Sequence, residues 1–230
     1  AFGVDAYWID AESHIDAESK GYVIIEPEDV ITTHLSQIMN AYAADLLGQE
    51  EVQELLDDLQ ITYPNLVETV VPKVMPLYQL TSVLKCILEE TVPVSDLRLI
   101  LETIASINTQ KMDNEDIAEK IRPSLVPMLI QKMIKFKETI PLITLAPDLE
   151  QMILQSVRQN PDEKMLMLEG TLAKKILANL NEASENLNKE EKPVFLIVAP
   201  QIRKHVSKFI RAQLPSVNVL SFMELPEDRS

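Results

Sequence analysis

The chain has 230 residues, of which 46% are hydrophobic and 25% are charged, so it can bury a core without disulfides or metal. Its single cysteine, Cys86, excludes a disulfide framework and a cysteine-rich zinc or iron–sulfur site. The net charge of −15 argues against nucleic acid as the main partner. No apolar stretch approaches the length that spans a bilayer and no signal peptide is evident, so we expect a soluble piece.

The acidic charge is concentrated at one end of the chain. Residues 1–70 carry 15 acidic side chains and one basic side chain, Lys20, which gives this segment a net charge of −14. The remaining residues carry 21 acids and 20 bases and are nearly neutral. A field of one sign can steer a basic partner towards the surface that carries it. Solvated helix faces nevertheless explain most of the individual acidic residues.

The first part of the chain predicts two short strands followed by two helices. Residues 7–9 and 22–25 are aromatic and β-branched, which favours strands. From Pro27 to about Gly48, apolar residues recur every three or four positions, as in an amphipathic helix. An acidic helix follows and should end at Tyr63, because a residue before proline avoids the helical region.

The middle of the chain predicts further helices. A clear apolar stripe follows Pro76 as far as Leu88, and Ser95 is a candidate cap for the next helix. The stripe of that next helix consists of four residues: Leu97, Ile100, Leu101 and Ile104. Helical periodicity continues from residue 117 to 129 with Pro123 and Pro127 inside it, so we expect a kink or a broken helix there.

The last part of the chain alternates between strands and helices. Strands are predicted at 141–145, 194–198 and 217–221, and a short helix should begin at Pro147. A turn is expected at 160–162, and two further helices at 170–187 and 201–213. Strand, helix and strand at this spacing form a βαβ unit. The chain is therefore predicted to be α+β and mostly helical, with a C-terminal α/β part.

No motif in the sequence indicates catalysis. The three histidines lack paired ligand spacing, and the glycine-rich and nucleophile-elbow motifs are absent. Cys86 lies on the apolar side of its predicted helix and is interpreted as a small core residue. We therefore predict no enzyme activity, no cofactor and no metal. A thioredoxin-like enzyme or redox module remains an alternative, and it would require a reactive Cys86.

Two surfaces are candidates for binding a partner. One is the acidic segment with apolar residues at its helix ends: Leu46, Leu47, Val70 and Val71. The other is the basic helix that carries Arg203, Lys204, Lys208 and Arg211. The simpler interpretation of the basic helix is that it covers a sheet and turns a charged face outward.

Five blocks of sequence resemble one family. They are FGVDAYWID (2–10), VITTHLSQI (30–38), YAADLLGQEEVQELLD (42–57), the run from 66 to 105, and VLSFMELP (219–226). These blocks are similar to the cytoplasmic domain of the type III secretion export gate family (FlhA/LcrD/InvA). DLRLILET and TTHL look more like the flagellar branch, with the virulence injectisome branch as the alternative.

The resemblance implies a fold and a function. It implies a membrane portion that is not in this chain, and a portion at the cytoplasmic face of the bacterial inner membrane that forms a ring of nine. That portion docks flagellar export chaperones with bound substrates, and other export-apparatus proteins. Four subdomains are implied, of which the first is a thioredoxin-like remnant and the last is α/β. Their bounds are 1–23 with 73–92, an inserted 24–72, a helical 93–166, and 167–230.

The resemblance also implies a docking site between the first two subdomains. Matching the family motifs residue by residue places Asp45, Leu47, Val71 and Gln79 there. A shallow hollow lined by Leu47 and Val71 and rimmed by Asp45 would suit an amphipathic helix that presses an apolar side chain inward. From the residues alone, ordinary core positions are the favoured interpretation of Leu47 and Val71.

Overall fold

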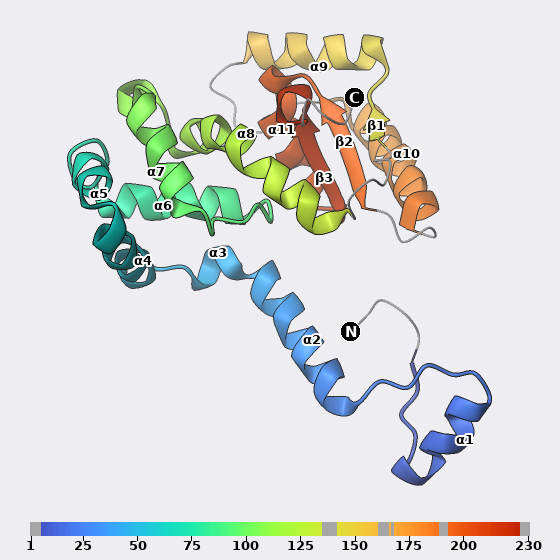
Figure 1. The fold of residues 1–230 in the computed structure, drawn as a ribbon. Coiled ribbons are helices and arrows are strands. Elements are labelled where there is room, and N and C mark those ends of the chain that lie inside the picture. Colours follow the sequence, from blue (N-terminus) through green and yellow to red (C-terminus); the bar gives the residue numbers. More distant parts are fainter. Residues whose placement is uncertain (1–5, 135–141, 161–165, 167, 189–192, 226–230) are drawn as a thin grey trace.

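The computed structural model describes residues 6–134, 142–160, 166, 168–188 and 193–225 (Figure 1). Within these ranges the chain is mostly helical and carries one three-stranded sheet. This confirms the predicted α+β class. None of the helices in the described ranges combines the length and hydrophobicity needed to cross a bilayer.

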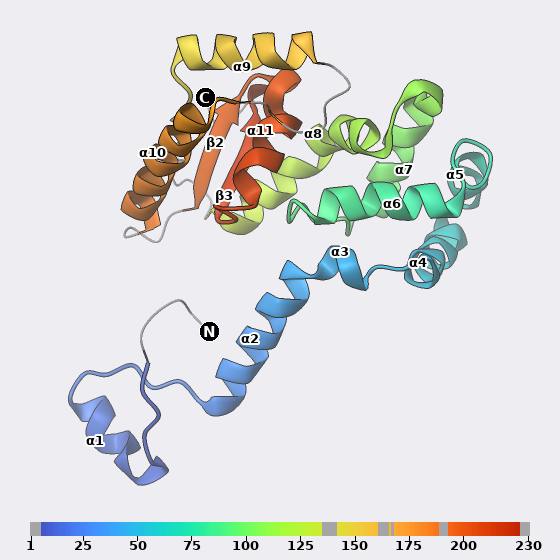
Figure 2. The same cartoon turned by 180° about the vertical axis from the view of Figure 1, so that it is seen from behind.

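The N-terminal part projects away from the rest of the molecule (Figures 1 and 2). It consists of η1 (Ala11–Ser13), α1 (His14–Ser19) and α2 (Pro27–Ala41), none of which buries a residue. The strands predicted at 7–9 and 22–25 do not form, so these two predictions are wrong. A strand needs a neighbour to satisfy its backbone hydrogen bonds, and no strand lies beside these residues in the described part of the chain.

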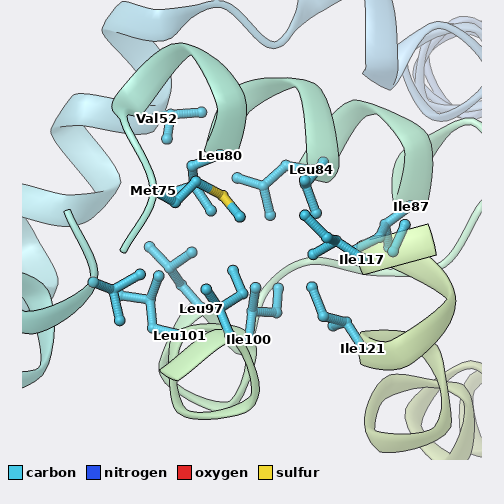
Figure 3. Packing of buried hydrophobic residues seen from close by; sticks show 14 of the residues in the cluster. Val52, Met75, Leu80, Leu84, Ile87, Leu97, Ile100, Leu101, Ile117 and Ile121 are labelled. Carbon is cyan, nitrogen blue, oxygen red and sulfur yellow. The ribbon is translucent and has the colours of Figure 1, made fainter. Parts of the chain in front are cut away.

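Six helices form a unit that we call the helical unit, residues 43–134. They are α3 (Ala43–Leu46), α4 (Gln49–Thr62), α5 (Pro64–Val70), α6 (Leu77–Leu88), α7 (Leu97–Ser106) and α8 (Asn114–Met133), with the short η2 (Thr109–Lys111) before α8. Their apolar side chains converge on one cluster, the main core (Figure 3). The predicted stripe of α7 is buried in full, because its four residues share one helical face.

The start of α7 differs from the prediction. Ser95 makes no cap; instead the carboxylate of Asp96 accepts a hydrogen bond from the backbone N–H of Leu99 at 3.0 Å. Asp96 satisfies a helix N–H that would otherwise lack a partner. Serine and aspartate are both favoured at a helix N-cap, and the order of Ser95 and Asp96 in the sequence does not decide which of them caps α7.

Helix α8 is shared by two cores. Ile117, Ile121 and Leu125 face the main core, whereas Val126 and Ile130 face the sheet. The helix runs unbroken through its two prolines. An interior proline costs about 3 kcal/mol, and burial of apolar residues on two sides of the helix offsets that cost.

The rest of the described chain forms what we call the C-terminal unit, residues 142–225. It contains β1 (Leu142–Thr144), α9 (Pro147–Gln159), α10 (Gly170–Asn188), β2 (Val194–Val198), α11 (Pro200–Arg211), β3 (Val217–Ser221) and η3 (Phe222–Glu224). The strands are parallel in the order β1-β2-β3, with Leu142 opposite Phe195 and Val194 opposite Val217. These strands and helices, including the βαβ unit, confirm the prediction for this region. Most of the expected turn at 160–162 lies outside the described residues.

The sheet is covered on both faces. Val194, Leu196 and Val198 pack against α9, α10 and α11, whereas Phe195 and Ile197 pack against α8. Strand β1 and helix α9 fall within the expected 93–166 subdomain but pack with the C-terminal unit. The subdomain bounds inferred from the resemblance stay predictions.

Helix α11 does not turn its whole charged face outward. Ile202, Val206 and Ile210 pack against the sheet, as a sheet-covering helix requires. Arg203, however, is only 1% exposed and forms ion pairs with Glu90 of the helical unit. The interpretation of a charged outer face is therefore wrong for Arg203, because the partner acids lie on helices far away in the sequence.

Candidate docking surface

Two of the predicted site residues follow one another at α3. Asp45 is exposed on α3, and Leu47 directly after that helix is half-buried against the main core. The backbone N–H of Gly48 donates a hydrogen bond to the carboxylate of Glu51 at 2.8 Å, which caps α4 and fixes the turn after Leu47. Helix α3 packs against α6, so both residues lie beside that helix (Figure 1).

The other two predicted residues lie at the end of α5 and at the beginning of α6. Val71 follows α5, and its N–H donates to the carbonyl of Val67 at 2.8 Å. The Val71 side chain is half-buried against the main core, whereas the neighbouring Val70 is fully buried. Gln79 lies in the first turn of α6 and is half-buried. Val70 is thus an ordinary core residue, and Val71 lies at the edge of the core.

None of the four predicted residues is sealed inside the protein: Asp45 is exposed, and Leu47, Val71 and Gln79 are half-buried. Leu47 and Val71 form part of the rim of the main core, with the fully buried Met75 and Leu80 beneath that rim. A cavity of about 520 Å³ lies elsewhere, between α9 and the start of α10. We call the surface around the four predicted residues the α6 rim.

Sequence reasoning missed or misplaced several exposed apolar side chains near the α6 rim. Tyr42 and Leu46 belong to the apolar stripe predicted for residues 27–48, yet both are largely exposed. Val74 and Tyr78, next to the predicted Val71 and Gln79, are also exposed. The α6 pattern contains the signal for Tyr78, because it follows Leu77 on the side of the helix away from Leu80.

The surroundings of the α6 rim are acidic. Residues 42–79 contain seven acidic residues and one basic residue, Lys73. All seven carboxylates are exposed, and five of them belong to α4. A partner would therefore meet apolar side chains inside a negative field, which favours an apolar anchor flanked by basic residues.

The environment of Cys86 is not that of a reactive thiol. It is half-buried in the last turn of α6. Burial, followed by the charges of Glu89 and Glu115, raises the pKa of the Cys86 thiol to about 11. The thiolate is therefore scarce near neutral pH, which argues against the redox alternative. Among the described residues, no group of His, Cys, Asp or Glu side chains is arranged to hold a metal ion.

The sequence of this chain matches a known protein family and its curated members. The sequence model of the FHIPEP family matches residues 1–230. The chain belongs to the FHIPEP family. It is 34% identical over 229 residues to the flagellar biosynthesis protein FlhA of Escherichia coli K12, which covers 100% of this chain and 32% of that protein. FlhA of Helicobacter pylori J99 is 37% identical over 227 residues, covering 98% of this chain and 31% of its own length.

Solved structures show the same fold. The Chlamydia pneumoniae CdsV protein superimposes with a TM-score of 0.80 at 26% identity, covering 99% of this chain and 65% of its own. The nonameric SctV-C of EPEC has a TM-score of 0.77 at 25% identity and covers 94% of this chain and 65% of its own. The nonameric EscV cytosolic domain, which comes from a type III secretion system, has a TM-score of 0.71 at 25% identity and covers 88% of this chain and 59% of its own. This FHIPEP chain spans about a third of the length of its curated FlhA relatives.

Proposed function

We propose that this FHIPEP chain is the docking domain of a flagellar type III export gate at the cytoplasmic face of the bacterial inner membrane. Its α6 rim binds export chaperones that carry their substrates. The flagellar assignment is supported by the FlhA relatives, which are 28–37% identical to this chain. The injectisome alternative rests on the EscV cytosolic domain, a type III secretion protein that is 25% identical to this chain.

One observation carries the docking proposal. Leu47 and Val71 are half-buried at the edge of the main core, within a stretch of sequence, residues 42–79, that carries seven acidic residues and one basic residue. An amphipathic helix could insert an apolar side chain at this edge and place basic residues against Asp45. The apolar anchor would provide most of the affinity, and the acidic field would raise the association rate.

Two structural relatives guide the proposal for assembly. The EPEC relative is described as nonameric, and CdsV has been solved in complex with CdsO. We extend both features to this chain: the intact protein forms a ring of nine, and the domain binds another export-apparatus protein besides the chaperones.

The test is the substitution Val71→Glu, measured by calorimetry against flagellar export chaperones that carry their substrates. A buried carboxylate at the anchor position should weaken binding at least about thirtyfold, which corresponds to about 2 kcal/mol. Ile61→Glu is the matched control, because Ile61 is 83% exposed at the end of α4, within the same acidic surroundings. This control should bind like the wild type.

A parallel set of injectisome chaperone complexes separates the two branches. Flagellar complexes should bind and injectisome complexes should not. Unchanged affinity of Val71→Glu for every flagellar complex, with the variant folded, would refute the α6 rim as the docking site. Tight binding to the injectisome set alone would replace the flagellar assignment.

A further inference from the structure

A line of ion pairs closes the seam between the helical unit and the C-terminal unit. Basic residues of α11 meet acidic residues from the end of α6 and the beginning of α8. The pairs are Arg211 with Glu89 (3.1 Å), Lys208 with Glu115 (2.6 Å), Lys204 with Asp116, and Arg203 with Glu90 (2.6 Å) and Glu119.

Arg203 lies at the centre of this seam and has a partner for each of its N–H groups. Its Nε donates to Glu119 at 2.7 Å. Its Nη1 donates to Glu90 at 2.6 Å and to the carbonyl of Val219 at 3.2 Å, and its Nη2 donates to both carboxylates. Only a planar guanidinium offers this set of donors, so lysine could not replace it.

Glu90 is held from two sides. Besides Arg203, its carboxylate accepts a hydrogen bond from Nη1 of Arg122 at 2.8 Å. Arg122 is itself 3% exposed and anchored by Glu224 at 2.9 Å, so it cannot follow Glu90 if that residue moves. The carboxylate of Glu90 therefore has a position fixed by both units.

The residue after Glu90 adopts a strained backbone. Thr91 has φ = 58°, the only positive φ outside glycine among the described residues. This conformation is unfavourable for a β-branched side chain. It persists because Glu90 on one side is held by two guanidinium groups and Val92 on the other side is fully buried. Backbone strain survives where its surroundings determine the conformation from both sides.

The ion pairs of Glu90 and the backbone strain at Thr91 oppose one another. A buried ion-pair network must offset the cost of removing its charges from water, so its net contribution to stability is small although its geometry is specific. The strain at Thr91 is released when Glu90 leaves its position. The closed arrangement at the end of α6 is therefore held only by the modest excess of the ion-pair attraction over the desolvation cost and the backbone strain.

We propose that the end of α6 and the turn that follows it, residues 86–91, form a strained catch, which the C-terminal unit holds closed through Arg203 and which opens when Glu90 is released. Because α6 also lies beneath the α6 rim, the state of the catch sets the position of the helix at that surface. This second consequence rests on the proposed function, whereas the catch itself does not.

Cys86 is a built-in reporter for the catch. It lies one turn before Glu90, and the charges that act on its thiol are those of Glu89 after α6, Asp113 and Glu115 at the start of α8, and Lys208 on α11. In the closed state the thiol is half-buried with a pKa of about 11, so it reacts slowly. Opening the last turn exposes the thiol to solvent and removes the burial that keeps it protonated.

The experiment measures the reaction of the full chain with a chromogenic disulfide reagent under native conditions. Arg203→Gln should react at least about tenfold faster than the wild type, because Glu90 loses its main partner. Thr91→Asn should react roughly fivefold more slowly, because asparagine accepts the left-handed conformation more readily and the closed state loses strain.

A control variant and a folding check complete the design. Arg98→Gln removes a charge of the same type from an exposed ion pair with Glu102 on α7 and should leave the rate unchanged. The docking site is tested by the calorimetry of Val71→Glu and the catch by the reactivity of Cys86, so a failed docking site and a failed catch give different results. Circular dichroism checks folding, and if Arg203→Gln unfolds, Thr91→Asn decides alone. Equal rates for wild type and Thr91→Asn would overturn the catch.

Discussion

Glu90 and Glu119 bind the same guanidinium group, yet replacing each by glutamine should affect stability very differently. We predict that Glu90→Gln lowers the free energy of unfolding by about 3 kcal/mol at neutral pH. Glu119→Gln should change it by less than about 1 kcal/mol. The two substitutions remove the same charge from the same cluster, so each is the control for the other.

The magnitude follows from the environment of each carboxylate. Burial disfavours the charged form of Glu90, but the charges of Arg203 and Arg122 outweigh burial and lower the pKa of Glu90 from 4.5 to about 2. The folded protein therefore favours the carboxylate that glutamine would remove. For Glu119, burial outweighs the hydrogen bond and charge of Arg203 and raises its pKa above the ordinary value. A neutral side chain is thus tolerated at Glu119 and not at Glu90.

Urea unfolding of the wild type and both variants at neutral pH measures the difference, provided that the slope with denaturant is unchanged. A second measurement uses acid. Because folding lowers the pKa of Glu90, its contribution is complete above about pH 4.5 and is lost as the pH falls towards 2. This part of the acid sensitivity should vanish in Glu90→Gln. A loss of stability in Glu119→Gln as large as that in Glu90→Gln would refute the reasoning.

Three further outcomes are expected. Asp96→Ala should cost about 1 kcal/mol of stability, whereas Ser95→Ala should change the stability by less than about 0.5 kcal/mol, because only Asp96 caps the N–H of Leu99. Chemical denaturation measures both variants, and equal losses of stability would contradict the cap. Phe195→Ala should cost about 3–5 kcal/mol in the same assay, because this fully buried ring joins the sheet to α8. Burial, then the charges of Lys204 and Lys208, lowers the pKa of His205, so stability should fall as the pH drops below about 6.5, and this dependence should disappear in His205→Gln when unfolding is compared at about pH 5 and pH 8.

Local patterns predicted most of the secondary structure. The stripe of α7 and the strands β2 and β3 follow from apolar spacing alone, because each buries a face within its own segment. Tyr63 ends α4 for a reason contained in two residues, the backbone restriction before Pro64. Predictions of this kind do not depend on what lies elsewhere in the fold.

The failures share the opposite property. The predicted strands at 7–9 and 22–25 needed a neighbouring strand, which no local pattern supplies. Arg203 resembled a surface residue because its acidic partner Glu90 lies more than a hundred positions away. The periodicity of α8 was recognised, but its continuation through Pro123 and Pro127 depends on burial in two different cores, which no local pattern shows.

The residues alone indicated an apolar surface with Leu46, Leu47, Val70 and Val71, and the family resemblance selected Leu47 and Val71 from it and added Asp45 and Gln79. The structure places Leu47 and Val71 at the edge of the core, a position between the two alternatives that the residues had left open. The exposure of Tyr78 depends on which helices pack against α6, such as α3, and this is a property of tertiary packing.

The shared helix α8 has a consequence for dissecting this protein. A truncation after α8 would remove the sheet that covers Val126 and Ile130. An isolated C-terminal unit would expose Phe195 and Ile197, which α8 covers in the intact chain. Either fragment would expose an apolar surface to water and would aggregate. The two halves should therefore melt together in a single calorimetric transition, and expression experiments that cut between them should yield insoluble material.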